Sequence, residues 1–522
     1  MKLKNFVCGR WLEGAGPGQA LVDPVLGTEI ARASTEGLDF AAALDHARDV
    51  GGPALRRLSF AERAGLLAKV AEVLVANRAT YGEIALANSG NTETDAAIDI
   101  DGAIGTVKFY ARAGATLGDA RTLKDGGLVR LGKDEGFQAL HVMTPLHGAA
   151  IHINAFNFPA WGLWEKAAVA LLAGMPVVVK PATATAWLAQ RMVEDVVAAG
   201  VLPDGALSIL CGGAGGLLDH VTGADVIAFT GSADTAARIR GHARVVGEST
   251  RVNIEADSLN ACLLAPDVRP GSAEFDLFVR EVAREMTIKA GQKCTAIRRV
   301  LVPAQARDAV AEAIGARLAK TVVGNPRNPS VRMGPLVSAQ QRRSADAGLA
   351  ELKREAAVIH DGGPDFVPVD ADPAVGTFLP PTLLSVADPA DAKAVHEIEV
   401  FGPVATIVPY DGADQAFALA QRGGGSLVAS VFSADGGFLE EAALELADCH
   451  GRILAVDAAV GPASTGHGIV MPMCLHGGPG RAGGGEELGG LRGLRLYHQR
   501  TAVQGPRDRL EGLAARAAAI DS

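Results

Sequence analysis

The residues best suited to covalent chemistry lie in the hexapeptide Gly291-Gln292-Lys293-Cys294-Thr295-Ala296. A cysteine thiolate attacks carbon, and a neighbouring lysine favours the thiolate over the thiol. Gly291 allows the backbone to turn sharply beside it. A single cysteine is nevertheless more often a small buried hydrophobe than a nucleophile. The assignment therefore depends on what the rest of the chain supplies.

Two polar residues at predicted strand ends could assist Cys294. Asn157 lies between a predicted strand and a predicted helix, where its side-chain amide can donate to a developing oxyanion. A helix cap or turn residue is the alternative. Glu255 ends an apolar stretch and can act as a general base if it is partly desolvated. An N-cap or an ion pair is the alternative for this carboxylate.

Three further segments could hold a nucleotide. Lys180 ends a buried strand, where it can reach ribose or phosphate oxygens or remain solvated. The segment 229–232, Phe-Thr-Gly-Ser, can meet a pyrophosphate at a helix N-terminus. Glu399 can bind a ribose diol or simply belong to a turn. The glycines at 212–216 do not form a clean G-x-G-x-x-G motif, and the chain has no P-loop motif. The sequence therefore supports neither of the usual glycine-rich motifs for binding nucleotides.

The glycine-rich region before the C-terminus offers no metal motif. His467 and His476 lie in glycine-rich loops without metal-ligand spacing, so both are taken as loop residues. Residues 477–490 are interpreted as a flexible loop. No metal site is predicted.

The first half of the chain alternates between strand and helix patterns. Ser59 and Glu62 form a predicted capping box before a helix to about Asn77, and further helices are expected at 81–87 and 101–113. Strands near 149–153, 176–179, 206–210 and 224–229 alternate with helices at 161–173, 188–199 and 233–242. Such alternation predicts a doubly wound parallel sheet, which binds ligands at the C-terminal ends of its strands.

A second α/β run follows a loop at 266–271, whose Pro and Gly content suggests a domain boundary. The expected elements are a helix at 274–290 leading into Cys294, strands at 298–303, 356–360, 382–386 and 404–410, and helices at 305–320 and 338–355. Extended hairpin strands are expected at 122–146, and a last strand at 493–499 is followed by a helical tail.

Composition narrows the function classes. A net charge of −10 argues against a role on nucleic acid or at a membrane surface. The chain has 6 widely scattered cysteines and no C-x-x-C pair, so disulfides are not expected. Free cysteines of this kind are typical of a protein in the reducing cytoplasm, where this protein is expected to lie. The N-terminal residues lack the apolar core of a signal peptide.

The order of these motifs resembles the aldehyde dehydrogenase superfamily over nearly the whole chain. The carriers are Asn157, Lys180-Pro181, Phe229-Thr230-Gly231-Ser232, Glu255, Gly291-Gln292-x-Cys294 and Glu399-x-Phe401-Gly402-Pro403. The resemblance implies an α/β fold with a doubly wound NAD(P)-binding domain (1–121 and 147–258), a catalytic domain (259–485), oligomerisation strands (122–146 and 486–505) and a helical tail (506–522). It also implies a homo-oligomer, with a dimer favoured.

The resemblance implies a role for each motif. Cys294 attacks the aldehyde, Asn157 stabilises the oxyanion, and Glu255 activates the water that hydrolyses the thioester. The residues expected to bind the cofactor are Ile153, Asn154, Lys180, Thr183, Phe229, Thr230, Gly231, Ser232, Glu399 and Phe401. Lys293 has none of these roles and is expected to face solvent.

The chain departs from the family at three places. Many members have a glutamate at position 183, which binds the adenosine ribose; Thr183 would not repel a 2′-phosphate, so NADP is predicted over NAD. The usual Glu-Leu-Gly-Gly becomes Glu255-Ala256-Asp257-Ser258, so the backbone beside Glu255 is expected to differ. The segment 456–474 replaces the usual aromatic one and should shape the substrate mouth.

A closer resemblance is to the aldehyde dehydrogenases of coenzyme A-dependent aromatic ring degradation, including the domain found in phenylacetate-pathway ring-opening enzymes. Its carriers are the segments 464–468 and 476–491. It implies an aldehyde substrate linked to coenzyme A. Three alternatives remain: a CoA-acylating dehydrogenase, which would generally lack Glu255, a generic aliphatic semialdehyde dehydrogenase, and a non-catalytic binding protein on the same fold.

Overall fold

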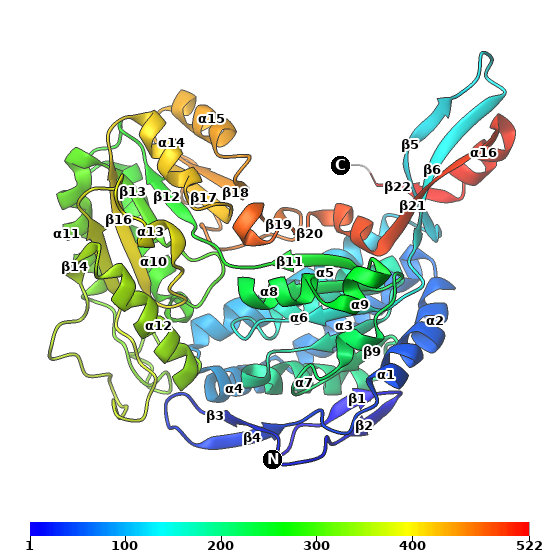
Figure 1. The fold of residues 1–522 in the computed structure, drawn as a ribbon, viewed down its shortest axis with the longest axis horizontal. Coiled ribbons are helices and arrows are strands. Elements are labelled where there is room, and N and C mark those ends of the chain that lie inside the picture. The colour runs from blue at the N-terminus through cyan, green and yellow to red at the C-terminus, as the bar shows by residue number, and fades with distance from the viewer. Residues whose placement is uncertain (521–522) are drawn as a thin grey trace.

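The computed structural model describes residues 1–520, in which two seven-stranded sheets form two lobes and a four-stranded arm projects away from them (Figure 1). The first lobe holds the sheet β11-β10-β7-β8-β9-β1-β2. Its five parallel strands are β7 (Ala150–Ile153), β8 (Val177–Lys180), β9 (Leu207–Ile209), β10 (Val226–Thr230) and β11 (Arg251–Glu255). Strands β1 (Asn5–Val7) and β2 (Arg10–Leu12) add an antiparallel edge.

Helices cover both faces of this sheet because side chains along each strand point alternately to opposite faces. Val177 and Val179 pack with one set of helices, whereas Val178 packs with the other. The first set comprises α3 (Phe60–Ala76), α4 (Arg78–Ser89), α5 (Glu93–Ala115), α6 (Trp161–Ala173) and α7 (Ala186–Ala198); the second comprises α1 (Phe40–His46), α8 (Ala233–Arg240) and α9 (Ala243–Glu248). The predicted doubly wound parallel sheet is confirmed.

Local signals place several helix starts. The Ser59 side chain accepts from the Glu62 N–H while Glu62 accepts from the Ser59 N–H, which confirms the predicted capping box of α3. Helix α5 begins eight residues before the predicted 101, because Thr92 and Asp95 form a second capping box.

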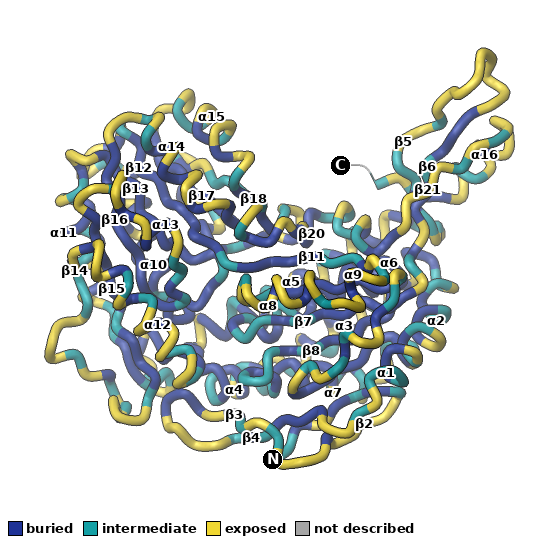
Figure 2. The backbone as a smooth tube through the Cα atoms, viewed as in Figure 1, coloured by how far each residue is buried: buried dark blue, intermediate teal, exposed yellow. Residues whose placement is uncertain are grey.

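The second lobe holds the sheet β14-β15-β16-β13-β12-β17-β18, parallel except for β14. Its strands are β12 (Ala261–Leu264), β13 (Arg299–Pro303), β14 (Ala356–His360), β15 (Thr382–Val386), β16 (Val404–Tyr410), β17 (Ser426–Phe432) and β18 (His450–Val456). Its helices are α10 (Ala273–Thr287), α11 (Arg307–Leu318), α12 (Ala339–Leu352), α13 (Ala394–Glu397), α14 (Ala413–Gln421) and α15 (Gly436–Glu445). The interiors of both lobes are buried (Figure 2).

The predicted boundary loop was misplaced. The chain leaves the first sheet after Glu255 and enters the second at Ala261, whereas residues 266–271 join β12 to α10 within the second lobe. The Pro and Gly residues there serve a turn inside one lobe. The division of the chain into functional domains stays a prediction.

The projecting arm is the sheet β21-β6-β5-β22, with helix α16 (Arg507–Ala514) packed against it. Its strands are β5 (Thr122–Arg130), β6 (Phe137–Pro145), β21 (His498–Pro506) and β22 (Ala517–Ala519). Leu140, Val142 and Leu510 form its small core. Figure 2 shows how exposed the rest of the arm is.

Two predictions at the C-terminus were wrong. The expected strand at 493–499 is instead a 3-10 helix over Gly490–Tyr497, and the strand starts at His498. Leu491, Leu494 and Tyr497 recur every third residue, which suits the three residues per turn of a 3-10 helix. The predicted helical tail ends at Ala514 and is followed by β22; residues 521–522 lie outside the described part.

Among residues 1–520, no helix is both long enough and apolar enough to cross a bilayer.

Candidate active site

Cys294 sits on a strained turn at the end of α10. Lys289 and Ala290 have φ values of 52° and 51°, and Gly291 follows with 66°. Left-handed backbone at two non-glycine residues is costly and persists where the surroundings enforce it. A Cβ on Gly291 would lie 2.2 Å from the Gly402 oxygen, so only glycine fits.

Two side-chain amides, those of Gln292 and Asn260, hold this turn. The amide of Gln292 donates to the Lys289 oxygen at 3.0 Å and accepts from the Val337 N–H at 2.9 Å. Asn260 donates to the Cys294 oxygen at 2.8 Å. These bonds fix the backbone on both sides of the thiol.

Lys293 does not face solvent, contrary to the expectation for it. Its side chain is 1% exposed and its ammonium lies 2.6 Å from the Glu285 carboxylate. The hydrogen bonds of Gln292 and Cys294 hold the backbone of this turn, and the Lys293 side chain points into the second lobe. A positive charge next to Cys294 in sequence is therefore neutralised by a partner on α10.

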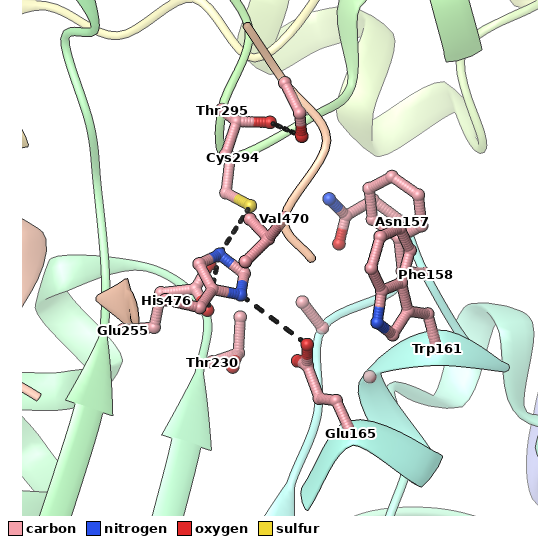
Figure 3. Close-up of a pocket in the computed structure, with 13 residues that line it drawn as sticks. Asn157, Phe158, Trp161, Glu165, Thr230, Glu255, Cys294, Thr295, Val470 and His476 are labelled. Carbon is pink, nitrogen blue, oxygen red and sulfur yellow. Dashed lines mark hydrogen bonds and ion pairs between the residues drawn. The ribbon is translucent and has the colours of Figure 1, made fainter. Parts of the chain in front are cut away.

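The two lobes bring Cys294, Asn157 and Glu255 to one cavity of about 40 Å³ (Figure 3). Asn157 follows β7 and Glu255 ends β11, so both come from the C-terminal edge of the first sheet. Cys294 reaches them from the second lobe. The other lining residues are Ala155, Phe158, Trp161, Gly162, Glu165, Thr230, Thr295, Gly468, Val470 and His476. Gly468 and Val470 belong to the segment expected to shape the substrate mouth.

His476 also lines this cavity, which the sequence interpretation missed. It lies in strand β19 (Leu475–Gly477), which pairs with β20 (Glu486–Leu488), so the predicted flexible loop at 477–490 contains a hairpin. The hairpin docks on β11, since the Gly485 N–H donates to the Ile254 oxygen. The His476 Nε2 consequently lies 3.9 Å from the Cys294 sulfur and 3.5 Å from Glu255.

Behind His476 lies a buried charged network. The His476 Nδ1 is 3.5 Å from Glu165, and Lys166 bridges Glu165 at 3.0 Å and Glu487 at 2.9 Å. Both Glu165 and Lys166 come from α6, whose other residues are mostly apolar. A Glu-Lys pair inside an apolar helix was the sequence signal for this network. His467, the other loop histidine, is instead buried against Ser430, with 2.6 Å between Nδ1 and Oγ.

Burial and charge together set the ionisation of the cluster. Burial raises the pKa of Cys294 well above its usual value, and the carboxylate of Glu255 raises it further. Burial lowers the pKa of His476, but Glu255 and Glu165 outweigh this effect and raise it to about 9. Burial disfavours a charged Lys166, yet Glu165 and Glu487 raise its pKa above the usual value. Lys166 and His476 offset part of the charge of the three carboxylates Glu165, Glu255 and Glu487, and the predicted absence of a metal stays a prediction.

A larger cleft of about 660 Å³ opens on the other side of Cys294. It shares Ala155, Asn157, Thr230, Glu255 and Cys294 with the narrow cavity. All ten residues expected to bind the cofactor line it: Ile153, Asn154, Lys180, Thr183, Phe229, Thr230, Gly231, Ser232, Glu399 and Phe401. The cleft lies at the C-terminal ends of the parallel strands, the position expected for a dinucleotide.

The polar groups of this cleft suit a nicotinamide dinucleotide. Within residues 1–520, the Asn154 amide and the Thr230 hydroxyl are buried without a hydrogen-bond partner and are available to a ligand, whereas the Glu399 Oε1 lies 3.6 Å from the Arg298 Nε. Burial lowers the pKa of Lys180 and raises that of Glu399 to about 7. The Lys180 ammonium is suited to bind a phosphate, and the Glu399 carboxylate is suited to accept hydrogen bonds from ribose hydroxyls.

Two backbone N–H groups at the start of helix α8 already have hydrogen-bond partners within the protein. The Ser232 hydroxyl accepts from the Thr235 N–H, and Asp257 accepts from the Ala233 N–H at 3.1 Å. The second Asp257 oxygen lies 3.6 Å from Arg481. Asp257, one of the departures from the family pattern, therefore places a carboxylate at the helix end expected near the pyrophosphate.

The fold and the paired cavities define an aldehyde dehydrogenase: the family model for the aldehyde dehydrogenase family matches residues 11–495, and the chain belongs to this family. The chain is 60% identical over 479 residues to a 3,4-dehydroadipyl-CoA semialdehyde dehydrogenase of Aromatoleum evansii, covering 92% of this chain and 93% of that relative. The resemblance predicted from the motif order is confirmed.

Solved structures agree on the fold. Betaine aldehyde dehydrogenase from Staphylococcus aureus in complex with NAD⁺ superposes with a TM-score of 0.84 at 23% identity, over 96% of this chain and 95% of that one. A putative aldehyde dehydrogenase from Burkholderia cenocepacia gives 0.82 at 25% identity, over 97% of both chains. The predicted aldehyde dehydrogenase fold is confirmed.

Proposed function

We propose that this aldehyde dehydrogenase oxidises a coenzyme A-linked semialdehyde, 3,4-dehydroadipyl-CoA semialdehyde, to the carboxylate with NADP as the acceptor. The observation that carries the proposal is the meeting of Cys294, Asn157 and Glu255 between a narrow cavity and a dinucleotide-sized cleft. The substrate is that of a relative 60% identical over nearly the whole chain.

Each residue of the centre would have one task. The Cys294 thiolate attacks the aldehyde carbon. The Asn157 side chain and the Cys294 backbone N–H donate to the oxygen as it becomes negative. Glu255 takes a proton from the water that hydrolyses the thioester and releases the carboxylate. The residues of the larger cleft would hold the dinucleotide, which would supply the hydride acceptor for the oxidation.

The cleft favours NADP at its adenosine end. Thr183 follows β8, and its hydroxyl donates to the Gly212 oxygen at 3.1 Å. Glu255 and Asp257 line the same cleft, but Glu255 ends β11 and Asp257 follows it, and β10 and β7 separate this strand from β8. Three strand spacings amount to about 14 Å. These two carboxylates therefore lie far from a 2′-phosphate held near Lys180 and Thr183.

The narrow cavity suits the aldehyde end of an extended acyl chain. A space of about 40 Å³ beside Cys294 has no room for the nucleotide part of coenzyme A. The thioester end would thus remain outside, and the apolar rings of Phe158 and Trp161 would contact the acyl chain. The two rings meet edge to face at 5.8 Å.

The test is a panel of semialdehydes, free and as coenzyme A thioesters, assayed with NADP and NAD. We expect the highest kcat/KM for the coenzyme A-linked C6 semialdehyde with NADP, and no NADPH formation by Cys294→Ala. Equal kcat/KM for free and linked semialdehydes would remove coenzyme A from the proposal. A carboxylic acid product distinguishes hydrolysis from transfer of the acyl group to a second coenzyme A.

Assembly and compartment are part of the same proposal. The exposed arm formed by 122–146 and the C-terminal strand would pair two copies into a homodimer, whose mass light scattering can measure. Six free cysteines suit the reducing cytoplasm.

A further inference from the structure

The cluster around Cys294 contains a histidine for which the reaction above has no task. The His476 Nε2 lies 3.9 Å from the Cys294 sulfur, and its Nδ1 lies 3.5 Å from the Glu165 carboxylate (Figure 3). This is the order nucleophile, base and orienting acid found where a side chain must be activated for attack. Contacts of this length tighten when the substrate is bound.

We propose that Cys294, His476 and Glu165 act as a thiol–imidazole–carboxylate triad that ionises the nucleophile. The proposal rests on the proposed function, because Cys294 must be the attacking group. It adds a base for the first half of the reaction and leaves Glu255 for the hydrolysis of the thioester.

The proton transfer can be followed atom by atom. The proton leaves the Cys294 sulfur for Nε2 of His476, and the electron pair of the S–H bond stays on sulfur. The Nδ1 atom faces the Glu165 carboxylate at 3.5 Å, an ion-pair contact that would hold the ring in place. The sulfur pair then forms the bond to the aldehyde carbon, while the π pair of the carbonyl moves onto its oxygen near Asn157.

The carboxylates around the pair favour a protonated His476 but disfavour a Cys294 thiolate. Glu255 on β11, Glu165 and Lys166 on α6, and Glu487 on β20 surround the pair. The carboxylates raise the pKa of the Cys294 thiol beyond what burial does, and they raise that of His476 to about 9 despite its burial. The two groups titrate as a pair. These carboxylates therefore oppose the thiolate, and the proposal rests on the 3.9 Å contact between Nε2 and the sulfur, at which the charge of a protonated His476 stabilises the Cys294 thiolate directly.

Lys166 fixes the acid of the triad. Its ammonium lies 3.0 Å from one Glu165 oxygen, while the other Glu165 oxygen faces His476. Burial raises the pKa of Glu165, but Lys166 and His476 outweigh it and hold that pKa below its usual value. Glu165 therefore stays ionised and can accept from Nδ1.

The test measures Cys294 ionisation directly, without aldehyde or cofactor. The rate of Cys294 alkylation by iodoacetamide is followed by mass spectrometry of the Cys294 peptide from pH 5 to 10. We expect His476→Phe and His476→Asn to shift the ionisation upward by at least one pH unit, so that the rate at pH 7 falls at least tenfold. The difference from the wild type should narrow as the pH approaches 10, and a circular dichroism spectrum that matches the wild type shows that each variant is folded.

Two further variants keep the test decisive. Glu165→Gln should shift the profile in the same direction by a smaller amount, and it remains informative if His476→Phe does not fold. His220→Gln, an exposed histidine outside the cavity, should leave the profile unchanged. Alkylation of both His476 variants at the wild-type rate at pH 7 would overturn the triad. Activity in Cys294→Ala would instead overturn the proposed function itself.

Discussion

The ammonium of Lys293 lies 2.6 Å from the carboxylate of Glu285, and both side chains are 1% exposed. The lysine next to the nucleophile therefore belongs to a buried ion pair. Removal of one partner leaves a charge uncompensated in the interior, which costs more than the pair itself contributes.

Lys293→Met should lower the free energy of unfolding by about 3–5 kcal/mol. The double variant Lys293→Met/Glu285→Met should recover most of this loss, because no buried charge remains. Urea unfolding followed by circular dichroism measures both. A single variant as stable as the wild type would show that Glu285 finds another partner or takes up a proton.

Glu255→Gln should lower turnover by about 10²–10⁴-fold, because water attack on the thioester loses its base. The acyl group should then accumulate on Cys294 and add its mass to the intact protein. A pre-steady-state burst of NADPH near one per active site is the second readout. Full turnover in this variant would favour transfer of the acyl group to coenzyme A.

Asn157→Ala should lower kcat by about 10²–10³-fold, the usual loss for one oxyanion donor. NADP affinity, measured by fluorescence titration, serves as the control. A change in KM with kcat intact would assign Asn157 to substrate binding instead.

Thr183→Glu should move the cofactor preference toward NAD, because a carboxylate there repels the 2′-phosphate. We expect the ratio of kcat/KM for NADP to that for NAD to fall at least tenfold. Thr183→Ser, which keeps the hydroxyl that bonds Gly212, is the matched control. A clear NAD preference in the wild type would refute the NADP assignment at once.

The charge of His476 should make stability depend on pH. Its pKa rises from the ordinary 6.5 to about 9, since Glu255 and Glu165 outweigh the effect of burial. Because the folded-state pKa lies above the unfolded one, this stabilisation is complete below pH 6.5 and disappears as the pH rises through 9. It amounts to at most about 3 kcal/mol.

Thermal unfolding of the wild type and of His476→Phe at pH 6.5 and 9.5 measures this contribution. The wild-type midpoint should fall more over this interval than that of the variant. Equal falls would show that His476 is neutral throughout.

The sequence by itself determined the parts of this protein that are local or ordered along the chain. Alternating strand and helix patterns predicted the doubly wound sheet, and Ser59 with Glu62 predicted the start of α3. The order of Asn157, Glu255 and Cys294 predicted the family, since each lies at a strand end or turn with a recognisable local pattern. Local patterns failed at Gly490–Tyr497, where a period of three formed a 3-10 helix rather than a strand.

Only the tertiary structure decided which side chains face Cys294. Lys293 is adjacent in sequence yet points to α10, because the left-handed turn at 289–291 and the Asn260 bond to the Cys294 oxygen fix the backbone around it. His476 is 182 residues away yet reaches the sulfur, because the β19–β20 hairpin docks on β11. Sequence patterns report local backbone preference, whereas the direction of a buried side chain depends on charges and packing supplied by distant elements. The tertiary structure therefore determines which side chains meet in the cavity and what chemistry they can perform.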